Sequence, residues 1–350
     1  MKIFITLLAS VYALGLVVLA KDSLAPKAQL EDLSKQALAT TLASLSKVQH
    51  PNVSGTKTCT GDTLRFRRDW KTLSAEERKE YINAVLCVQS KPGLTPPQLA
   101  PGVRSRFDDF IATHINVTQF VHFTGTFLGW HRWYIWAFEQ TLREEFFDGS
   151  DTFLSGNGEY IAKKEDIVLY LEGYPPIVLP AGSGGGCVTS GPFKNYTVNL
   201  GPGNLSLPGG KFESKKQPLE YNPRCFKRDL TTELIRMFAN YSSVTHLISQ
   251  NDHIWNFQME MQGVPGSGSI GPGDPAFYLH HAMIDRVWWI WQNQDPENRE
   301  TAISGTNTFL NRPPSENTTL DTLIDLGYAW GEPIAMREIM STVKDSSLPS

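Results

Sequence analysis

Three of the chain's eight histidines lie close together in the sequence, at His114, His122 and His131. Neutral imidazole binds zinc, copper, iron and nickel, and a histidine set without thiolate or carboxylate partners favours copper or zinc. On one continuous helix, their spacings of eight and nine residues would mean rises of about 12 and 13.5 Å, too far for ligands of one ion. A shared metal therefore requires a break in the helix, and spacing alone leaves open that some of them are ordinary core or surface residues.

The sequence around these histidines permits such a break. His114 lies on an apolar helical face, and the run NVTQFV before His122 is β-branched and turn-prone. Gly125 and Gly129 allow a turn, and WHRWYIWAFEQTLREE, starting at Trp130, is rich in helix formers. We therefore expect the first helix to end near His114, an irregular segment to hold His122, and a new helix to begin at Trp130.

Other parts of the chain also show helical periodicity. A capping-box pattern at Ser74 and Glu77 predicts the start of one helix. The apolar run from Ile167 to Leu171 predicts a strand or a buried loop. The region 181–224, rich in Gly, Pro and Asn, reads as a long surface excursion, and the tail shows one weak apolar segment. The predicted helices span residues 27–47, 73–88, 229–238, 244–262 with breaks, and 277–293. These patterns predict a mainly α protein with long loops.

Composition narrows the class of protein. With 41% hydrophobic residues and nine Trp, the chain can build a sizeable core. The net charge is −4 and the basic residues are scattered, so the sequence lacks the basic stripe of a nucleic-acid-binding protein.

The first twenty residues resemble a secretory signal. Lys2 precedes an apolar stretch that ends in the small-residue cleavage signal Val18-Leu19-Ala20. The alternative, a membrane anchor, lacks a flanking stop-transfer charge cluster. We therefore expect a signal peptide at residues 1–20, one domain at 21–350, and a secreted protein with no membrane contact after cleavage.

Cysteines and sequons agree with export. An even number of cysteines in an oxidising compartment favours two disulfides. Three pairings exist, and we favour Cys59–Cys87 with Cys187–Cys225, because each closes a local loop that does not cross the histidine segment. Candidate N-glycosylation sites occur at Asn52, Asn116, Asn195, Asn204, Asn240 and Asn317.

Two strings carry a family resemblance. HFTGTFLGWHRWYIWAFEQTLR and DPAFYLHHAMIDRVWWIWQ closely resemble the two copper-binding signatures of the tyrosinase and catechol oxidase family, and SGNGEY, GGGCVTSGPF and MQGVPGSGSIG resemble its short secreted fungal members. The resemblance implies a four-helix bundle around a pair of coppers, each held by three histidines. It also implies the oxidation of phenols or o-diphenols to quinones with dioxygen.

The resemblance also assigns residues. His114, His122 and His131 match the ligands of the first copper, and His281 matches the last ligand of the second. His280 is then expected just behind the ligands, since adjacent side chains on a helix point about 100° apart.

Residues near the second signature have further expected roles. Asp285 could orient an imidazole or pair with a buried arginine such as Arg132, and an ordinary structural salt bridge is equally open. The tryptophans of both signatures are expected to pack in the core.

Two departures from the family are visible. The family places an HxxxH motif between segments like MQGVPGSGSIG and PGDPAF, but this chain has no HxxxH, and Gly271 joins those segments directly. A block that contains a PYWDW-like motif is likewise missing after Glu145. His246 and His253 are seven residues apart, about 10 Å on a helix, so at most one could substitute, and we expect both to be surface or packing residues. His50 is not expected to be a ligand.

A thioether cysteine is also absent from this chain. Some family members have Cys two residues before the second ligand, where this chain has Phe120. The orientation of His122 must then come from packing or hydrogen bonds.

Three functions compete on the sequence. The first is a secreted copper oxidase that acts on small phenols with dioxygen. The second is a silent or impaired family member that binds one copper or none because its second site is incomplete. The third, a mononuclear zinc hydrolase, requires a general base and an open position, and no HExxH or comparable motif supports it.

Overall fold

The computed structural model describes residues 25–45, 64–144, 155–169, 176–201, 216–263 and 271–343. This part of the chain is mainly helical, as predicted, and the helices surround one aromatic core. A helix spans residues 25–45. The others are α2 (Ala75–Ser90), α3 (Arg106–Val121), α4 (Phe127–Glu144), α5 (Thr232–Phe238), α6 (Tyr241–Gln250), α7 (Ile254–Gly263), α8 (Ala276–Gln294) and α9 (Pro296–Arg299), with short 3-10 turns η1 (Trp70–Thr72), η2 (Phe309–Asn311), η3 (Gly327–Ala329) and η4 (Met336–Ile339).

Strands play a small part in the described residues. They form antiparallel pairs: β1 (Ile167–Leu169) with β2 (Ile177–Leu179), β3 (Thr197–Val198) with β4 (Arg224–Cys225), and β5 (Leu323–Ile324) with β6 (Ile334–Ala335). The apolar run from Ile167 is therefore a strand rather than a buried loop.

Local capping fixes where the bundle helices begin. Ser74 and Glu77 form the predicted capping box of α2, each bonding the other's backbone N–H. Ser105 and Asp108 do the same for α3. These reciprocal bonds satisfy amide groups that a helix start leaves unpaired, so the entry points of both helices are set by their own sequence.

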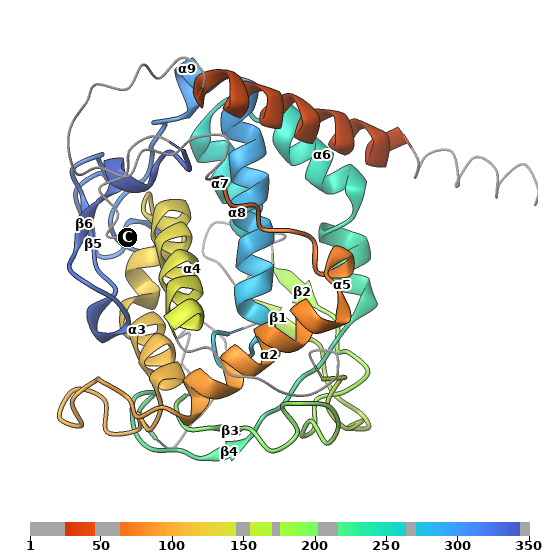
Figure 1. The fold of residues 1–350 in the computed structure, drawn as a ribbon, viewed down its shortest axis with the longest axis vertical. Coiled ribbons are helices and arrows are strands. Elements are labelled where there is room, and N and C mark those ends of the chain that lie inside the picture. The colour runs from red at the N-terminus through yellow and green to blue at the C-terminus, as the bar shows by residue number, and fades with distance from the viewer. Residues whose placement is uncertain are drawn as a thin grey trace, which may run out of the picture.

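The helices that carry the signatures pack side by side. Helix α4 contacts α8, α3 and α2, and α3 also contacts α2. Figure 1 shows α3, α4 and α8 together, with the helix of residues 25–45 crossing one end of α8. Buried aromatic rings fill the space between them, with Phe110 edge-on to Phe138 at 5.2 Å and Phe138 stacked on Tyr278 at 3.5 Å. Each such pair adds about 0.5–1.5 kcal/mol beyond simple burial.

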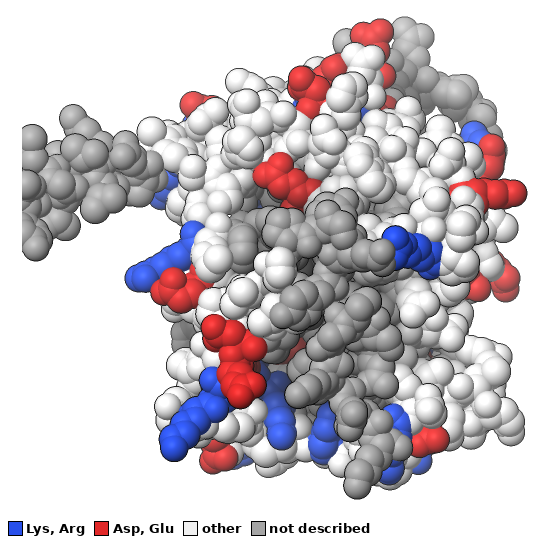
Figure 2. Space-filling model, turned by 180° about the vertical axis from the view of Figure 1, so that it is seen from behind, with Lys and Arg blue, Asp and Glu red and all other residues white. Residues whose placement is uncertain are grey.

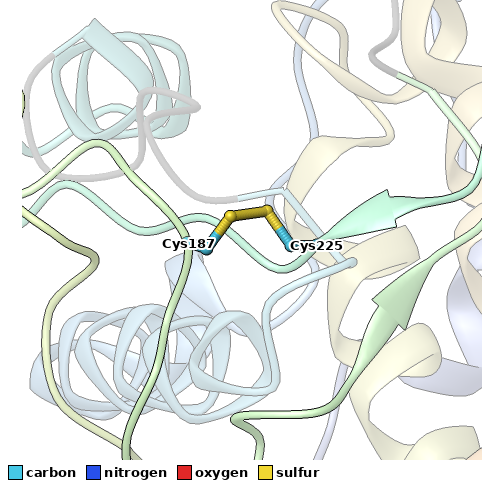
Figure 3. The surroundings of a disulfide bond; sticks show 2 residues. All are labelled: Cys187 and Cys225. Atoms are coloured by element: carbon cyan, nitrogen blue, oxygen red, sulfur yellow. A yellow bond between two sulfur atoms is a disulfide. The ribbon is translucent and has the colours of Figure 1, made fainter.

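The predicted disulfide between Cys187 and Cys225 is present. It joins residues 38 apart in sequence, with Cα atoms 5.6 Å apart, and ties the end of β4 to a preceding loop (Figure 3). The expectation that 181–224 is a surface excursion is wrong in part, because Val188, Phe193 and Leu200 are buried in the core. Single apolar residues between glycines gave no periodic signal, yet they anchor the loop.

The tail beyond α9 likewise contributes more than its weak pattern indicates. Ile324, Leu326, Ala329, Met336 and Ile339 are all buried. They belong to short 3-10 turns and a two-residue ladder, which have too few residues to show a period. The tail therefore closes one side of the helical core.

Some predictions fall outside the described residues. These are the signal peptide at 1–20, Asn52, Cys59 and hence the Cys59–Cys87 bond, His50, Asn204, and the chain just after Glu144. The division into a signal peptide and one domain from 21 to 350 stays a prediction. Among the described sequons, Asn116, Asn195 and Asn317 are exposed, and Asn240 is the partly buried N-cap of α6.

The described surface gives two further findings. In the part of the chain described, no helix combines the length and apolar character required to span a membrane. Figure 2 shows the face opposite to that in Figure 1. On its described part, acidic and basic side chains are interspersed, without a continuous basic patch. This distribution agrees with the scattered charges of the sequence.

Candidate metal centre

The structure brings the three clustered histidines together. His114 lies in α3, His131 lies in α4, and His122 caps the C-terminus of α3. Their ring centroids are 5.0 to 5.7 Å apart. One nitrogen from each ring lies within 4.8 Å of the others, a spacing at which one ion can reach all three.

The path between these histidines differs from the predicted one. Helix α3 does not end near His114 but continues to Val121, and His122 is the first residue with extended backbone, at φ −124° and ψ 138°. Its ring folds back along the helix, with Nδ1 2.9 Å from the carbonyl oxygen of Thr118. One residue with extended backbone, His122, is therefore enough to bring its ring back towards His114. The irregular segment expected between the two histidines is not needed.

The turn into α4 is also shorter than predicted. Helix α4 begins at Phe127 rather than Trp130, so Gly129 lies inside the helix and not in the turn. A Cβ at Gly129 would lie 2.5 Å from Cε of Met336, and one at Gly125 would lie 2.5 Å from Cβ of Thr318. Both glycines therefore permit close contact with the tail of the chain.

Backbone carbonyls orient two of the rings. Nδ1 of His131 lies 2.8 Å from the carbonyl oxygen of Phe127, and Nδ1 of His122 is held by Thr118 in the same way. A carbonyl can only accept, so each Nδ1 carries the proton and each Nε2 keeps a lone pair. Nε2 of His114 and of His131 is buried with no hydrogen-bond partner among the described residues. Buried ring nitrogens without a partner fit a metal ion.

Burial keeps the cluster neutral. Desolvation lowers the pKa of His114 and His131 well below the ordinary value of 6.5, and their histidine neighbours lower it further. Desolvation also lowers the pKa of His122, while its bond to Thr118 acts in the opposite direction. Neutral imidazole is the form that binds metals, so the site is in ligand form at neutral pH.

His281 lies beside this cluster but does not join it. Its ring stacks on His131, with centroids 4.4 Å apart and planes 9° apart, and Phe277 packs against it at 4.3 Å. Its Nδ1 is buried and unpartnered within the described chain, and burial lowers its pKa well below 6.5. His280 is partly buried, with its ring 5.7 Å from His281 and nearly perpendicular to it. The roles predicted for this pair stay predictions.

Asp285 forms a buried ion pair rather than a bond to an imidazole. Its Oδ1 accepts from Nε of Arg132 at 2.5 Å, and its Oδ2 accepts from Arg67 at 2.8 Å. Arg132 also donates to the carbonyl oxygens of Ile339 and Met340, and its guanidinium lies 3.6 Å over the Trp288 ring. This network joins α4, α8 and the tail immediately behind His131 and His281.

The other described histidines lie outside this cluster. His246 and His253 are exposed, as expected for surface residues. Among the described residues, His114, His122 and His131 form the single group with metal-binding spacing. Trp130, Trp133, Trp288 and Trp291 are buried, which agrees with core packing.

Arg67 was not anticipated, because it lies in a segment without periodicity. Gln262, which bonds to the residue after His122, was also missed. Both contacts join residues far apart in the sequence, and no local pattern marks them.

Comparison with known proteins decides the family. The family model described as the common central domain of tyrosinase matches residues 104–294. The chain belongs to the tyrosinase family. Tyrosinase P of Aspergillus terreus is 36% identical over 80% of this chain and 90% of its own length. N-acetyl-6-hydroxytryptophan oxidase ivoB of Emericella nidulans is 31% identical over 87% of this chain and 96% of its own length.

A solved structure agrees with this assignment. A point mutant of polyphenol oxidase from Thermothelomyces thermophila superposes with a TM-score of 0.78 at 35% identity, and the match covers 90% of this chain and 96% of that one. The tyrosinase family consists of oxidases that use copper, and the histidine cluster described above lies within the matched residues.

Proposed function

We propose that this chain is a secreted copper-dependent oxidase that converts phenols or o-diphenols to quinones with dioxygen. The observation that carries the proposal is the buried three-histidine cluster, with one nitrogen of each ring within 4.8 Å of the others. The names of its relatives support the substrate class, since one is a polyphenol oxidase and another oxidises a hydroxylated tryptophan derivative.

The residues present fit one copper ion. His114, His122 and His131 would hold it, because their neutral nitrogens converge and the Nε2 atoms of His114 and His131 have no other partner among the described residues. A bound copper would supply redox chemistry with dioxygen. The all-imidazole donor set suits copper better than magnesium or calcium, which prefer oxygen.

The described residues do not make a second set of this kind. His281 is the one residue there that matches a second-copper ligand, and the sequence contains no HxxxH. No step of the proposed reaction is therefore assigned to a second ion.

The protein's own residues shape the reaction space. Phe127, Phe277 and Trp130 lie with their ring centroids 4.3 to 6.1 Å from those of the histidines. Aromatic walls of this kind exclude water from the metal ligands and offer ring faces and edges to an aromatic substrate. His122 is only partly buried, whereas His114 and His131 are buried. We infer that a phenol approaches from the His122 side.

Secretion is part of the proposal. It is supported by the signal-like first twenty residues, the exposed sequons at Asn116, Asn195 and Asn317, and the Cys187–Cys225 disulfide. Expression of the full chain in a fungal host should place it in the medium, with a mass reduced by endoglycosidase. Retention in the cell without glycan would contradict this part.

Oxygen consumption tests the activity. The copper-loaded chain should take up dioxygen and form quinone when 4-methylcatechol is added, and a copper chelator should stop both. His122→Ala is the matched inactive variant. Equal rates in the chelated or His122→Ala protein would show that the cluster does not carry the reaction.

A further inference from the structure

The backbone immediately after His122 is strained. Phe123 has φ 51°, in the left-handed region, which glycine adopts freely and which bulky residues adopt only when their surroundings enforce it. This strained residue adjoins the one clustered histidine whose own backbone lies outside a helix. Its conformation therefore decides where the His122 ring can point.

Contacts from two distant segments hold Phe123 in place. Its N–H donates to Oε1 of Gln262 in α7, and its carbonyl oxygen accepts from the N–H of Leu310 at 3.2 Å. Its ring packs edge-on against Phe309, with centroids 5.1 Å apart. The strained conformation is thus fixed by α7 on one side and by η2 on the other.

Gln262 is committed to this one contact within the described chain. The side chain is 2% exposed, and burying an amide is unfavourable unless it makes hydrogen bonds. Its Oε1 bonds to Phe123, while its Nε2 has no partner among the described residues. Neither solubility nor apolar packing explains a buried glutamine at this position. Its hydrogen bond to the Phe123 N–H does explain it.

His122 needs such a hold because it has no covalent one. The residue two positions before it is Phe120, which cannot form a thioether bond and is 52% exposed. The ring of His122 has the Thr118 carbonyl on Nδ1, but this bond fixes the ring only if the backbone at 122 and 123 stays in place.

We propose that Gln262 is a positioning residue, which holds His122 in ligand geometry by clamping the left-handed backbone of Phe123. The inference deepens the proposed function and rests on it, because the ligand geometry is that of the proposed copper site. Gln262 does not contact the ion. It restricts His122 to few conformations before copper binds, so that less conformational entropy is lost on binding.

The first test compares two variants of the same helix. Gln262→Met removes the acceptor at similar length. Gln258→Met is the matched control, because Gln258 lies one turn earlier in α7, is 1% exposed, and donates to the carbonyl oxygen of Ser304 at 2.6 Å. Copper affinity is measured by competition titration and fold stability by thermal unfolding of the metal-free proteins. Gln262→Met should weaken copper binding about 10–100-fold, and Gln258→Met should leave it at the wild-type value.

The second test requires no metal. In metal-free protein labelled with ¹⁵N-histidine, His122 of the wild type should show a single Nδ1–H tautomer. Gln262→Met should broaden or split that signal without changing His131, and Gln262→Glu, which keeps an oxygen acceptor, should restore it.

The outcomes separate the two proposals. If Gln262→Met binds copper like the wild type, or if both methionine variants lose copper equally, the positioning role is overturned. If the wild type binds no copper, the proposed function fails, and the ¹⁵N spectra of the metal-free protein still decide whether Gln262 orders His122. An unchanged His122 signal in Gln262→Met would overturn the positioning role by itself.

Discussion

The half of the bundle built from α3 and α4 differs from the half built from α7 and α8 in its ligands but not in its packing. The first half supplies three convergent histidines, whereas His280 and His281 of the described second half lie outside that group. Yet each half buries two tryptophans almost completely, Trp130 and Trp133 in one and Trp288 and Trp291 in the other. Helix packing in this fold therefore does not depend on a full set of metal ligands.

The two halves are joined by charge as well as by apolar contact. Asp285 of α8 lies between Arg132 of α4 and Arg67, and Arg132 also holds two carbonyls of the tail. These bonds compensate for the burial of the Arg132 guanidinium, which desolvation otherwise disfavours, as its lowered pKa indicates. The ion pair thus links α4 to α8 next to the stacked rings of His131 and His281.

Removing one histidine from each half should give the largest contrast. His131→Ala deletes one of three ligands and should weaken copper binding by more than about 100-fold, since outer partners of ligands alone are worth 10–100-fold. His281→Ala should retain tight copper binding, because His281 stacks on the cluster without joining it. Copper affinity of both variants is measured by competition titration. An equal loss in both would show that the halves share one ion.

Breaking the link between the halves should cost stability. Asp285→Asn leaves the buried Arg132 guanidinium without its counter-charge and should lower the free energy of unfolding by about 3–5 kcal/mol. Urea unfolding of the metal-free protein measures this loss. The control is Asp321→Asn, which breaks an exposed pair with Arg337 and should change stability by less than about 1 kcal/mol. If both variants unfold alike, the buried pair does not hold the halves together.

Acid should destabilise the metal-free chain in a way that involves both halves. Burial lowers the folded-state pKa of His114, His131 and His281 below 6.5, so at lower pH the unfolded chain binds more protons than the folded one. Their stabilising contribution is therefore complete above pH 6.5 and falls as the pH drops towards the folded-state values. Each histidine contributes a slope of up to about 1.4 kcal/mol per pH unit.

His281→Gln should reduce that slope by the share of one histidine. Unfolding free energies between pH 7 and pH 5 test this. A slope identical to that of the wild type would mean that His281 has the same pKa in the folded and the unfolded protein.

The sequence predicts the first half of the site better than the second. The histidine spacing required a break in the helix, and the resemblance identified the residues that converge. The position of the break was wrong because the ring of His122 folds back on α3, a side-chain conformation that no periodicity reveals. In the region after Gly271, the sequence identified only His280 and His281.

The sequence anticipated one long-range contact, the pairing of Asp285 with Arg132, and missed the others. The capping box at Ser74 is local and was predicted, and so was the disulfide that closes a local loop. Arg67, Gln262 and the tail carbonyls lie far along the chain from their partners. Each makes only a few polar contacts, as Arg67 does with Glu139 and Asp285. Such contacts have no period, so only the folded arrangement identifies them.

Copper titration of the metal-free chain shows whether the α3–α4 half alone makes a copper site. If the α3–α4 half is a complete site, the wild type should bind about one tight equivalent of copper per chain, and His122→Ala should bind none at the same concentrations. A wild type without tight copper, or a His122→Ala variant that keeps the full equivalent, would contradict the account.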